Sequence, residues 1–349
     1  MLYDLIGKTG LEFNKIIGVE ALAVGAMVFL FTLLATRLIL PVLRAKKLNQ
    51  PINMYVMEHA GKAGTPTMGG ICFIIATLTV FLIWVVAEKC GVLGDSDKRA
   101  LIPLVLTLGL GVGNGLIGFI DDYKKLIKKQ NEGLTESQKL VLQIAIAAAY
   151  LAMMGMTDNL ITALRIPFTA VSIELGWFAY PLYLLVIIGF VNSTNITDGI
   201  DGLASSVGVS VSMALILLSV LAGSRYMGVA SGALLGALLG FLVFNHYPAK
   251  VFMGDTGSLF IGGMIMGCAI SEGELVAVII MSMVFILDML SSLWQRVYFK
   301  LTHGKRFFKK APVHHHFQLL SWSEIKIVTV FFLVSLAFCA IGVLGAWIG

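Results

Sequence analysis

The sequence contains little charge for its length. Asp, Glu, Lys and Arg make up 13% of its 349 residues, whereas soluble domains carry about 25%. Hydrophobic residues account for 58%, and the mean hydropathy is +0.91. A soluble globular fold is therefore excluded. The length of the chain then indicates how many membrane helices it can form and not how many globular domains. We expect an all-α polytopic membrane protein in which residues 1–349 form a single integral membrane domain.

Cysteine is also scarce, and its placement excludes further classes. The four cysteines are scattered, and three of them fall in apolar runs. No CxxC spacing occurs, so neither a disulfide framework nor a thiolate metal site is predicted. No nucleophilic Ser or Cys constellation appears. What the chain has instead is a small set of acids, lysines and histidines. This set suits phosphoryl transfer, because that chemistry depends on positioning and charge neutralisation.

Long apolar runs are abundant. A membrane-spanning helix needs about 20 apolar residues, and hydropathy predicts ten spans, of which the eighth is short for a bilayer. The expected spans are 18–40, 67–87, 101–120, 139–156, 177–193, 204–222, 228–246, 256–270, 274–295 and 325–347. Residues 1–17 are expected to form a short interfacial helix, and the loop 157–176 a small hairpin.

Lysine and arginine are distributed unevenly between alternate loops. The loops after odd-numbered spans hold 15 of them, and the loops after even-numbered spans hold five. Because cytoplasmic loops carry an excess of positive charge, the odd loops are expected in the cytoplasm, with both termini and the hairpin outside. The polar motifs at 62–67, 121–125, 192–201, 245–255 and 311–316 then all face the cytoplasm. This convergence predicts one cytoplasmic active site.

The stretch 190–203 is the most polar segment between two apolar runs. It carries Asp198 and Asp201 three residues apart, so the two share a face if a helix begins here. Asn195 or Thr197 would then cap the following helix. The N-terminus of that helix would present free N–H groups to a phosphate. The alternative is a polar hinge between two spans.

Three more aspartates lie at the ends of predicted spans. Asp121 and Asp122 close the third span, and Asp255 opens the eighth with glycines on both sides of it. Adjacent carboxylates repel, so one of them is expected to bind a cation or a proton. Mg²⁺ prefers such hard oxygen ligands together with substrate phosphates. The alternative for all three is a cap at a helix end.

Other motifs carry weaker signals. The three consecutive histidines 314–316 cannot share one helix face, which argues against a zinc triad and favours imidazoles that donate to phosphate. Phe252 is either a lipid-facing wedge or a stacking platform for a planar base. Asp288 lies inside the ninth span, where a functional carboxylate and a helix–helix hydrogen bond are about equally expected.

Taken together, the motifs resemble those of the polyprenyl-phosphate N-acetylhexosamine-1-phosphate transferases. The resemblance rests on Asp121-Asp122-Tyr123-x-Lys125, Asn195-x-Thr197-Asp198-Gly199-x-Asp201-Gly202-Leu203, Phe252-Met253-Gly254-Asp255-x-Gly257-Ser258 and Pro312-x-His314-His315-His316. The stretch Gly64-Thr65-Pro66-Thr67-Met68-Gly69-Gly70 and the histidine tract are similar to the phospho-N-acetylmuramoyl-pentapeptide transferase branch. That branch implies about ten helices in a homodimer of the bacterial plasma membrane, with a cytoplasmic cleft.

The resemblance also implies a reaction. Undecaprenyl phosphate attacks the β-phosphate of UDP-N-acetylmuramoyl-pentapeptide (UDP-MurNAc-pentapeptide), which yields UMP and lipid I for peptidoglycan synthesis. Mg²⁺ is the implied cofactor, membrane lipid is a further partner, and no nucleic acid is expected. Two alternatives stay open. One is a sister enzyme that moves GlcNAc-1-phosphate from UDP-GlcNAc onto the same lipid, and the other is a secondary transporter with a midplane ion site.

Residue roles follow from the same resemblance. Asp255 is the expected Mg²⁺ ligand, and Asp121 or Asp122, the latter slightly favoured, would deprotonate or orient the lipid phosphate. Lys125, Lys139 and His315 complete the expected catalytic set. The expected substrate-binding residues are Lys62, Thr67, Asn195, Asp198, Asp201, Asn245, Phe252, Gln295, Ala311, His314 and His315, with Phe252 stacked on uracil. Relatives often have Glu at the positions of Asp288 and Gln318.

Overall fold

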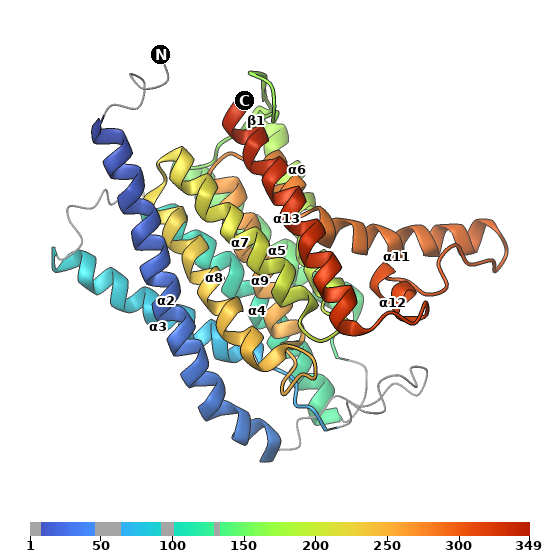
Figure 1. Ribbon diagram of the computed structural model, residues 1–349. Coiled ribbons are helices and arrows are strands. Elements are labelled where there is room, and N and C mark those ends of the chain that lie inside the picture. Colours follow the sequence, from blue (N-terminus) through green and yellow to red (C-terminus); the bar gives the residue numbers. More distant parts are fainter. Residues whose placement is uncertain (1–7, 46–63, 92–100, 129–132) are drawn as a thin grey trace.

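A bundle of long helices makes up most of the protein (Figure 1). The computed structural model describes residues 8–45, 64–91, 101–128 and 133–349. The long helices are α2 (Lys8–Ala45), α3 (Gly70–Lys89), α4 (Leu101–Lys128), α5 (Glu136–Met156), α6 (Ala179–Thr197), α7 (Leu203–Ala222), α8 (Arg225–Asn245), α9 (Gly254–Ser271), α11 (Met283–Leu301) and α13 (Glu324–Ile348). The short elements are β1 (Ala163–Arg165), β2 (Ser172–Glu174), η2 (Gly176–Phe178), α10 (Leu275–Met281) and α12 (Val313–Gln318). The all-α architecture predicted from composition is confirmed.

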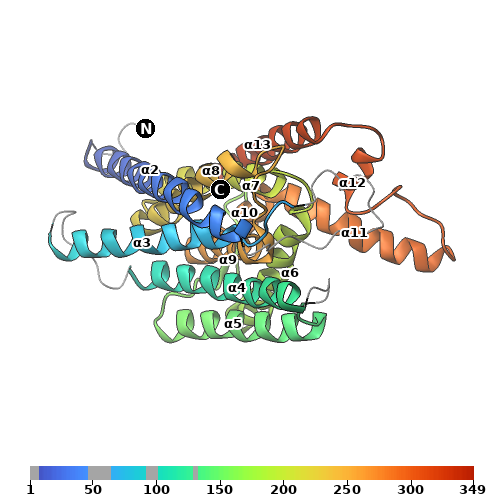
Figure 2. The same cartoon turned by 90° about the horizontal axis from the view of Figure 1, so that it is seen from below.

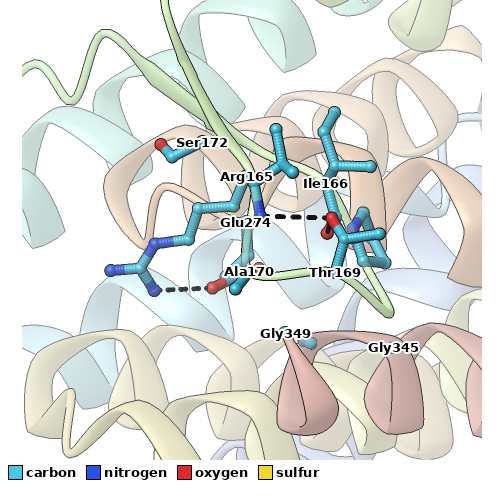
Figure 3. A pocket seen from close by; sticks show the side chains of 11 residues that line it. Arg165, Ile166, Thr169, Ala170, Ser172, Glu274, Gly345 and Gly349 are labelled. Carbon is cyan, nitrogen blue, oxygen red and sulfur yellow. Dashed lines mark hydrogen bonds and ion pairs between the residues drawn. The ribbon is translucent and has the colours of Figure 1, made fainter.

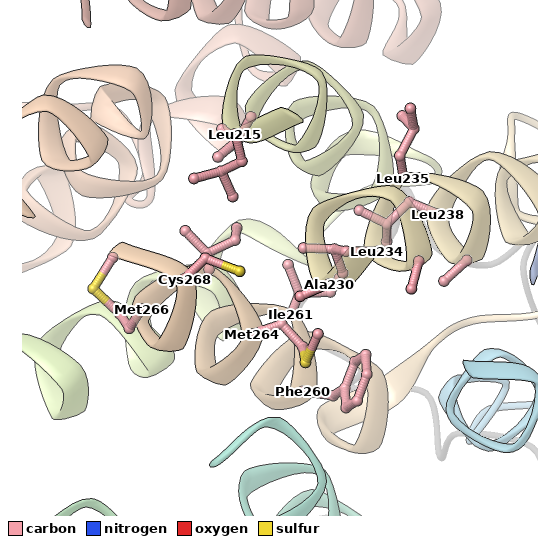
Figure 4. Close-up of a cluster of buried hydrophobic side chains, with 14 of the residues drawn as sticks. Leu215, Ala230, Leu234, Leu235, Leu238, Phe260, Ile261, Met264, Met266 and Cys268 are labelled. Atoms are coloured by element: carbon pink, nitrogen blue, oxygen red, sulfur yellow. The ribbon is translucent and has the colours of Figure 1, made fainter. Parts of the chain in front are cut away.

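Helices α7, α8 and α9 form the centre of the bundle, with α4 and α5 on one side and α2 and α13 on the other (Figure 2). Most side chains of α7 and α8 are buried, and nearly all of α9 is. Leu215, Leu234, Leu238, Ile261 and Met264 from these three helices gather in one apolar cluster (Figure 4). The core therefore lies along the same three helices whose ends carry the polar motifs.

Glycines set the closest helix contacts. On α8, glycines spaced four residues apart face the backbone of α2, as in the small-residue interfaces of membrane helices. A Cβ at Gly232 would lie 2.0 Å from the backbone oxygen of Ala21, and a Cβ at Gly236 would lie 2.0 Å from that of Gly25. Only glycine leaves room for this approach. The two glycines four residues apart therefore determine how closely α2 packs on α8.

The expected spans coincide with helices. Among the described residues, eight helices are long and apolar enough to cross a membrane, and nine if the bent pair α10–α11 is one span. Helix α9, which covers the short eighth span, is not among them but is buried in the bundle. The separate interfacial helix expected over residues 1–17 is wrong for the part that is described, because residues 8–17 continue unbroken into α2.

The expected ninth span over 274–295 corresponds to two helices and not to one straight helix. Helices α10 and α11 meet at Ser282 with a bend of 75°, and α11 then leaves the bundle sideways (Figure 1). Its outer half carries Gln295, Arg296 and Lys300. Charged groups of this kind are costly in hydrocarbon, which explains why the helix does not continue straight across.

The predicted hairpin exists at the opposite end of the bundle from the start of α9. Strands β1 and β2 pair antiparallel, with Ala163 opposite Glu174. A cavity of about 310 Å³ lies between this hairpin and the last turn of α13, and the Arg165 guanidinium donates to Glu274 there at 2.9 Å (Figure 3). Glu274 follows the end of α9, so the 18 residues of that helix separate this cavity from Asp255 by about 27 Å.

Candidate active site

The site begins with the close approach of α4 to the start of α9. A Cβ at Gly118 would lie 2.1 Å from the backbone oxygen of Asp255 and 2.5 Å from the amide nitrogen of Thr256. Gly118 therefore allows the backbones of α4 and α9 to come into contact. On α4, this contact lies about one helical turn before Asp121 and Asp122. This contact brings carboxylates more than 130 residues apart in the chain to one place.

Asp122 caps helix α9. Its Oδ2 accepts from the Thr256 amide at 3.0 Å and from the Thr256 hydroxyl at 2.8 Å, and its Oδ1 accepts from the Asp255 amide at 3.3 Å. A carboxylate at a helix N-terminus satisfies free N–H groups and matches the positive end of the helix dipole. Both oxygens of Asp122 are therefore occupied in holding Asp255 in place.

Asp121 and Asp255 share two lysines. The Lys125 ammonium lies 2.6 Å from Asp121 Oδ2 and 3.2 Å from Asp255 Oδ2. The Lys139 ammonium lies 2.6 Å from Asp255 Oδ2 and 3.5 Å from Asp121 Oδ2. Asp121 Oδ1 accepts from the Leu134 amide at 2.7 Å. The expected catalytic aspartates and lysines thus form one cluster, which we call the acid–lysine cluster.

Local sequence explains how Lys139 reaches this cluster. Thr135 accepts from the Gln138 amide through its side chain, and the Gln138 side chain accepts from the Thr135 amide. This reciprocal capping box fixes where α5 begins. Lys139 follows in the first turn of α5 and faces the end of α4, close to Asp121.

Asn195 and Thr67 approach the same cluster from two other elements. At the end of α6, the Asn195 amide donates to Asp255 Oδ1 at 2.8 Å and to the Ser258 hydroxyl at 2.9 Å. Gly254 has φ +69°, and a Cβ there would meet Asp122 Oδ2 at 2.5 Å and Thr67 Oγ1 at 2.9 Å. Thr67 therefore lies beside Asp122. This agrees with the prediction that the motifs at 62–67 and 121–125 lie at the same end of the bundle.

Phe252 belongs to a strip of chain that pairs with residues 66–70. The Phe252 amide donates to the Pro66 carbonyl at 2.9 Å, and its carbonyl accepts from the Gly69 amide at 2.8 Å. Because the backbone is held on both sides, the half-buried ring has a defined position next to Asp255. Asn245 anchors the start of the same loop, since its side chain donates to the Val251 carbonyl and accepts from the Ser205 hydroxyl.

No helix begins at Asp198, so the condition under which Asp198 and Asp201 would share a helix face is not met, and the alternative of a polar hinge between two spans describes this segment. Helix α6 continues to Thr197, and α7 begins only at Leu203, after Gly202 with φ 77° and without a side-chain cap. Residues 198–202 form a turn between α6 and α7. Asp198 and Asp201 therefore do not lie on one face of a helix. Asp201 Oδ2 accepts from the Ala249 amide at 2.9 Å.

Asp198 lies in the field of the acid–lysine cluster. Burial, followed by the negative charges of Asp255, Asp122 and Asp201, raises the pKa of the Asp198 carboxyl well above its usual value. The turn is therefore close enough to the cluster for the charges to interact. A cation or a donor group from a ligand would relieve this repulsion.

The three histidines have three different environments. His314 is fully buried, and its Nδ1 lies 2.7 Å from Asp288 Oδ2. His315 Nδ1 lies 2.6 Å from Gln318 Oε1, and His316 Nδ1 accepts from the Lys309 amide. The Nδ1 atoms of the three imidazoles therefore have three different partners.

The remaining predicted residues lie farther along the chain. Gln295 of α11 donates to the Phe308 carbonyl and accepts from the Phe308 amide, so it holds the loop that leads to α12. Ala311 is half-buried just before that helix. Lys62 lies outside the described residues.

The donors present fit a divalent cation. Carboxylate oxygens of Asp121, Asp122 and Asp255 lie within 4.8 Å of one another, and hard oxygen ligands of this kind suit Mg²⁺. Sequence reasoning missed Thr256 and Ser258, which fix Asp122 and Asn195. Both lie inside a motif that was recognised, but their partners are distant in sequence and gave no local signal.

A cluster of carboxylates, lysines and an amide at one end of a bundle of apolar helices is typical of membrane transferases that handle phosphorylated substrates. The model of Glycosyl transferase family 4 matches residues 104–273, and phospho-N-acetylmuramoyl-pentapeptide-transferase signature 1 matches residues 62–74. A phospho-N-acetylmuramoyl-pentapeptide-transferase from Staphylococcus aureus (strain bovine RF122 / ET3-1) is 39% identical over 335 residues, which cover 93% of this chain and 99% of the relative. One from Staphylococcus carnosus (strain TM300) is 40% identical over 324 residues, covering 92% and 97%. The chain belongs to the phospho-N-acetylmuramoyl-pentapeptide-transferase family.

Proposed function

We propose that the protein transfers phospho-N-acetylmuramoyl-pentapeptide from UDP-MurNAc-pentapeptide to undecaprenyl phosphate, with release of UMP and formation of lipid I. The observation that carries this proposal is identity of about 40% over 93% of the chain to relatives of that name. The acid–lysine cluster supports it independently, because a diphosphate substrate needs charge neutralisation and positioning more than a covalent nucleophile.

The arrangement in the membrane is part of the proposal. Ten spans, with α10 and α11 together as the broken ninth, leave both termini outside and the acid–lysine cluster on the cytoplasmic side. The positive charge of the odd loops supports this orientation. We place the protein in the bacterial plasma membrane as a homodimer with one integral membrane domain, residues 1–349, in each copy.

Asp255 would hold Mg²⁺, with Asp121 as the second carboxylate within reach. The cation would neutralise charge on the diphosphate and on the leaving UMP. Asp122 is already engaged with the N-terminus of α9, so its role is to position Asp255. This geometry favours Asp121 over Asp122 as the carboxylate that orients the lipid phosphate, contrary to the slight preference drawn from the sequence.

Lys125 and Lys139 are the groups that would bind phosphate oxygens. Each now contacts two carboxylates through flexible side chains, so each can turn toward an incoming anion without a change in the backbone. Asn195 would keep Asp255 oriented during this exchange. His315 lies on the same short helix as His314 and would complete the phosphate contacts.

The nucleotide would lie along the loop that carries Phe252. Its half-buried ring is held by backbone hydrogen bonds on both sides, which suits stacking on uracil. Thr67, Asn245, Asp198 and Asp201 would line or support this part of the pocket. Lys62, Gln295, Ala311 and His314 would complete the substrate-binding set.

The test is a transfer assay with the purified full chain in lipid nanodiscs. We expect Mg²⁺-dependent UMP release and a lipid-linked product on thin-layer plates with UDP-MurNAc-pentapeptide, and none with UDP-GlcNAc. Asp255→Asn should abolish release, whereas Glu274→Gln, a buried acid at the other end of the bundle, should retain it. Transfer from UDP-GlcNAc alone would assign the sister activity, and uptake into proteoliposomes without product would indicate a transporter.

A further inference from the structure

A pair of amide side chains joins α5 to α6. Gln143 on α5 is 2% exposed, and its Oε1 accepts from Asn192 Nδ2 on α6 at 2.9 Å. Gln143 Nε2 donates in return to Asn192 Oδ1 at 3.4 Å. Asn192 Nδ2 also donates to the Ile188 carbonyl at 2.8 Å, so both hydrogens of that amide are occupied. Within the described residues, no other side-chain hydrogen bond connects these two helices, and the amide pair is therefore their polar contact.

The acid–lysine cluster lies about one helical turn away and joins the same two helices. Lys139 stands four residues before Gln143 on α5. Asn195 stands three residues after Asn192 on α6. Residues at these spacings share a helix face. The Lys139 ammonium lies 2.6 Å from Asp255 Oδ2, and the Asn195 amide donates to Asp255 Oδ1 at 2.8 Å. Helices α5 and α6 are therefore bridged twice, once through Asp255 and once through the amide pair.

The two bridges respond differently to an arriving anion. Lys139 contacts Asp255 through a charge on a long flexible side chain, so phosphate oxygens would compete for it. Asn195 has a short side chain, and its reach is therefore set by the backbone of α6. The amide groups of Gln143 and Asn192 carry no charge, so an anion has no such hold on them. The amide pair can therefore keep the end of α6 in place while the bridge through Asp255 opens.

We propose that Gln143 is a positioning residue that acts through Asn192. Their amide pair holds the last turns of α6 against α5, so that Asn195 keeps Asp255 oriented while Lys139 turns to the phosphates of the nucleoside diphosphate substrate. The proposal rests on the proposed function and deepens it. In the part of the chain that the structure describes, neither amide hydrogen-bonds a member of the acid–lysine cluster. The pair therefore supports the groups that touch substrate and is not one of them.

Binding of UDP and of uridine tests the pair without the transfer reaction. Both probes are titrated by calorimetry into the full chain in nanodiscs with Mg²⁺, and only UDP carries phosphates. Gln143→Leu removes both hydrogen bonds of the pair and keeps a side chain of similar size. It should weaken UDP binding about tenfold, the effect of one lost hydrogen bond to a charged group, and leave uridine affinity unchanged. UDP binding at the wild-type level would overturn the proposal, and so would a parallel loss of both affinities, which indicates a general distortion of the pocket.

Exchanging the two side chains shows whether the pair itself matters. Gln143→Asn makes one amide a methylene too short, and Asn192→Gln makes the other a methylene too long, so each change alone should weaken UDP binding. The double variant restores the combined length and should recover most of the wild-type UDP affinity. Losses that add in the double variant would overturn the proposal. Both positions keep an amide in this exchange, so it decides the question even where Gln143→Leu folds poorly.

Two more variants complete the test. In an Asn195→Ala chain, Gln143→Leu should cause no further loss of UDP affinity, because the pair acts through Asn195. A further loss of about tenfold would overturn the proposal. Tyr150→Phe is the matched control: it removes another hydrogen bond of α5, from the Tyr150 hydroxyl to the Gly267 carbonyl, and should leave both affinities unchanged. A chain that binds UDP as proposed but fails to transfer the sugar phosphate would refute the proposed function and not the positioning role.

Discussion

Replacing Gly118 with alanine should separate the two halves of the active site. The added Cβ would lie 2.1 Å from the Asp255 backbone oxygen and 2.3 Å from its carbonyl carbon. Both are backbone atoms, so no side chain can rotate away. Ordinary contact begins at 3.4 Å, and α4 and α9 must therefore move apart locally by about 1.3 Å, the difference between these two distances.

That displacement has two consequences. The Asp122 carboxylate now accepts from the Thr256 hydroxyl at 2.8 Å and amide at 3.0 Å, and both distances would exceed the limit of a hydrogen bond. Overpacking a helix contact costs about 1–3 kcal/mol, which should lower the thermal unfolding midpoint. A misplacement of about 1 Å at the reacting groups can lower the rate roughly 100-fold, so UMP release should fall by about that factor.

Gly109 on the same helix provides the matched control. A Cβ there would have no atom within 4 Å, so Gly109→Ala adds the same methyl group without the clash. Its rate of UMP release and its unfolding midpoint should remain near wild type. A Gly118→Ala variant that releases UMP at the wild-type rate would show that the α4–α9 approach does not determine the geometry of the site.

Three other substitutions test individual roles. Asp122→Asn should lower the unfolding midpoint and UMP release together, because asparagine has one acceptor oxygen where Asp122 uses two to hold the Asp255 and Thr256 amides; loss of activity at unchanged stability would contradict the capping role. Asp198→Asn should raise the unfolding midpoint at pH 8. The ordinary Asp pKa is about 3.9. Because the pKa of Asp198 is higher in the folded protein, its ionisation destabilises the folded state at pH values above about 4 and has no effect well below that pH. The gain should therefore shrink as the pH falls toward about 4, and a constant gain would exclude this charge effect. Phe252→Ala should weaken uridine binding measured by calorimetry, and unaltered affinity would discard stacking on the base.

Much of the fold follows from patterns that are local in sequence. Apolar runs of about 20 residues predict the spans, and the loop 157–176 predicts the hairpin that β1 and β2 form. Alternation of positive charge between loops predicts that the motifs at Asp121 and Asp255 belong to one end of the bundle. The meeting of these two residues within the acid–lysine cluster agrees with that prediction.

The rest depends on contacts that have no local signal. The cap of α9 comes from Asp122, 134 positions before Thr256, so inspection of the residues that precede the helix cannot find it. The continuation of α6 through Thr197 likewise has no local signal in the hydropathy pattern. An aspartate at the end of a span is read equally well as a cap, a ligand or a base, and only its partners distinguish these roles.

The charge balance of the acid–lysine cluster explains why these roles are divided among several residues. Three carboxyl groups and two ammonium groups meet there, so the two lysines already offset the charges of Asp121 and Asp255 before any substrate arrives. A diphosphate and a lipid phosphate would add several more negative charges, and repulsion in a partly buried site is strong. Under the proposed function, the two lysines alone would not offset this repulsion, and a divalent cation would supply the additional positive charge. In the same proposal, Asp255 and Asp121 would be the metal ligands, and the lysines would neutralise them until the cation and the phosphates bind.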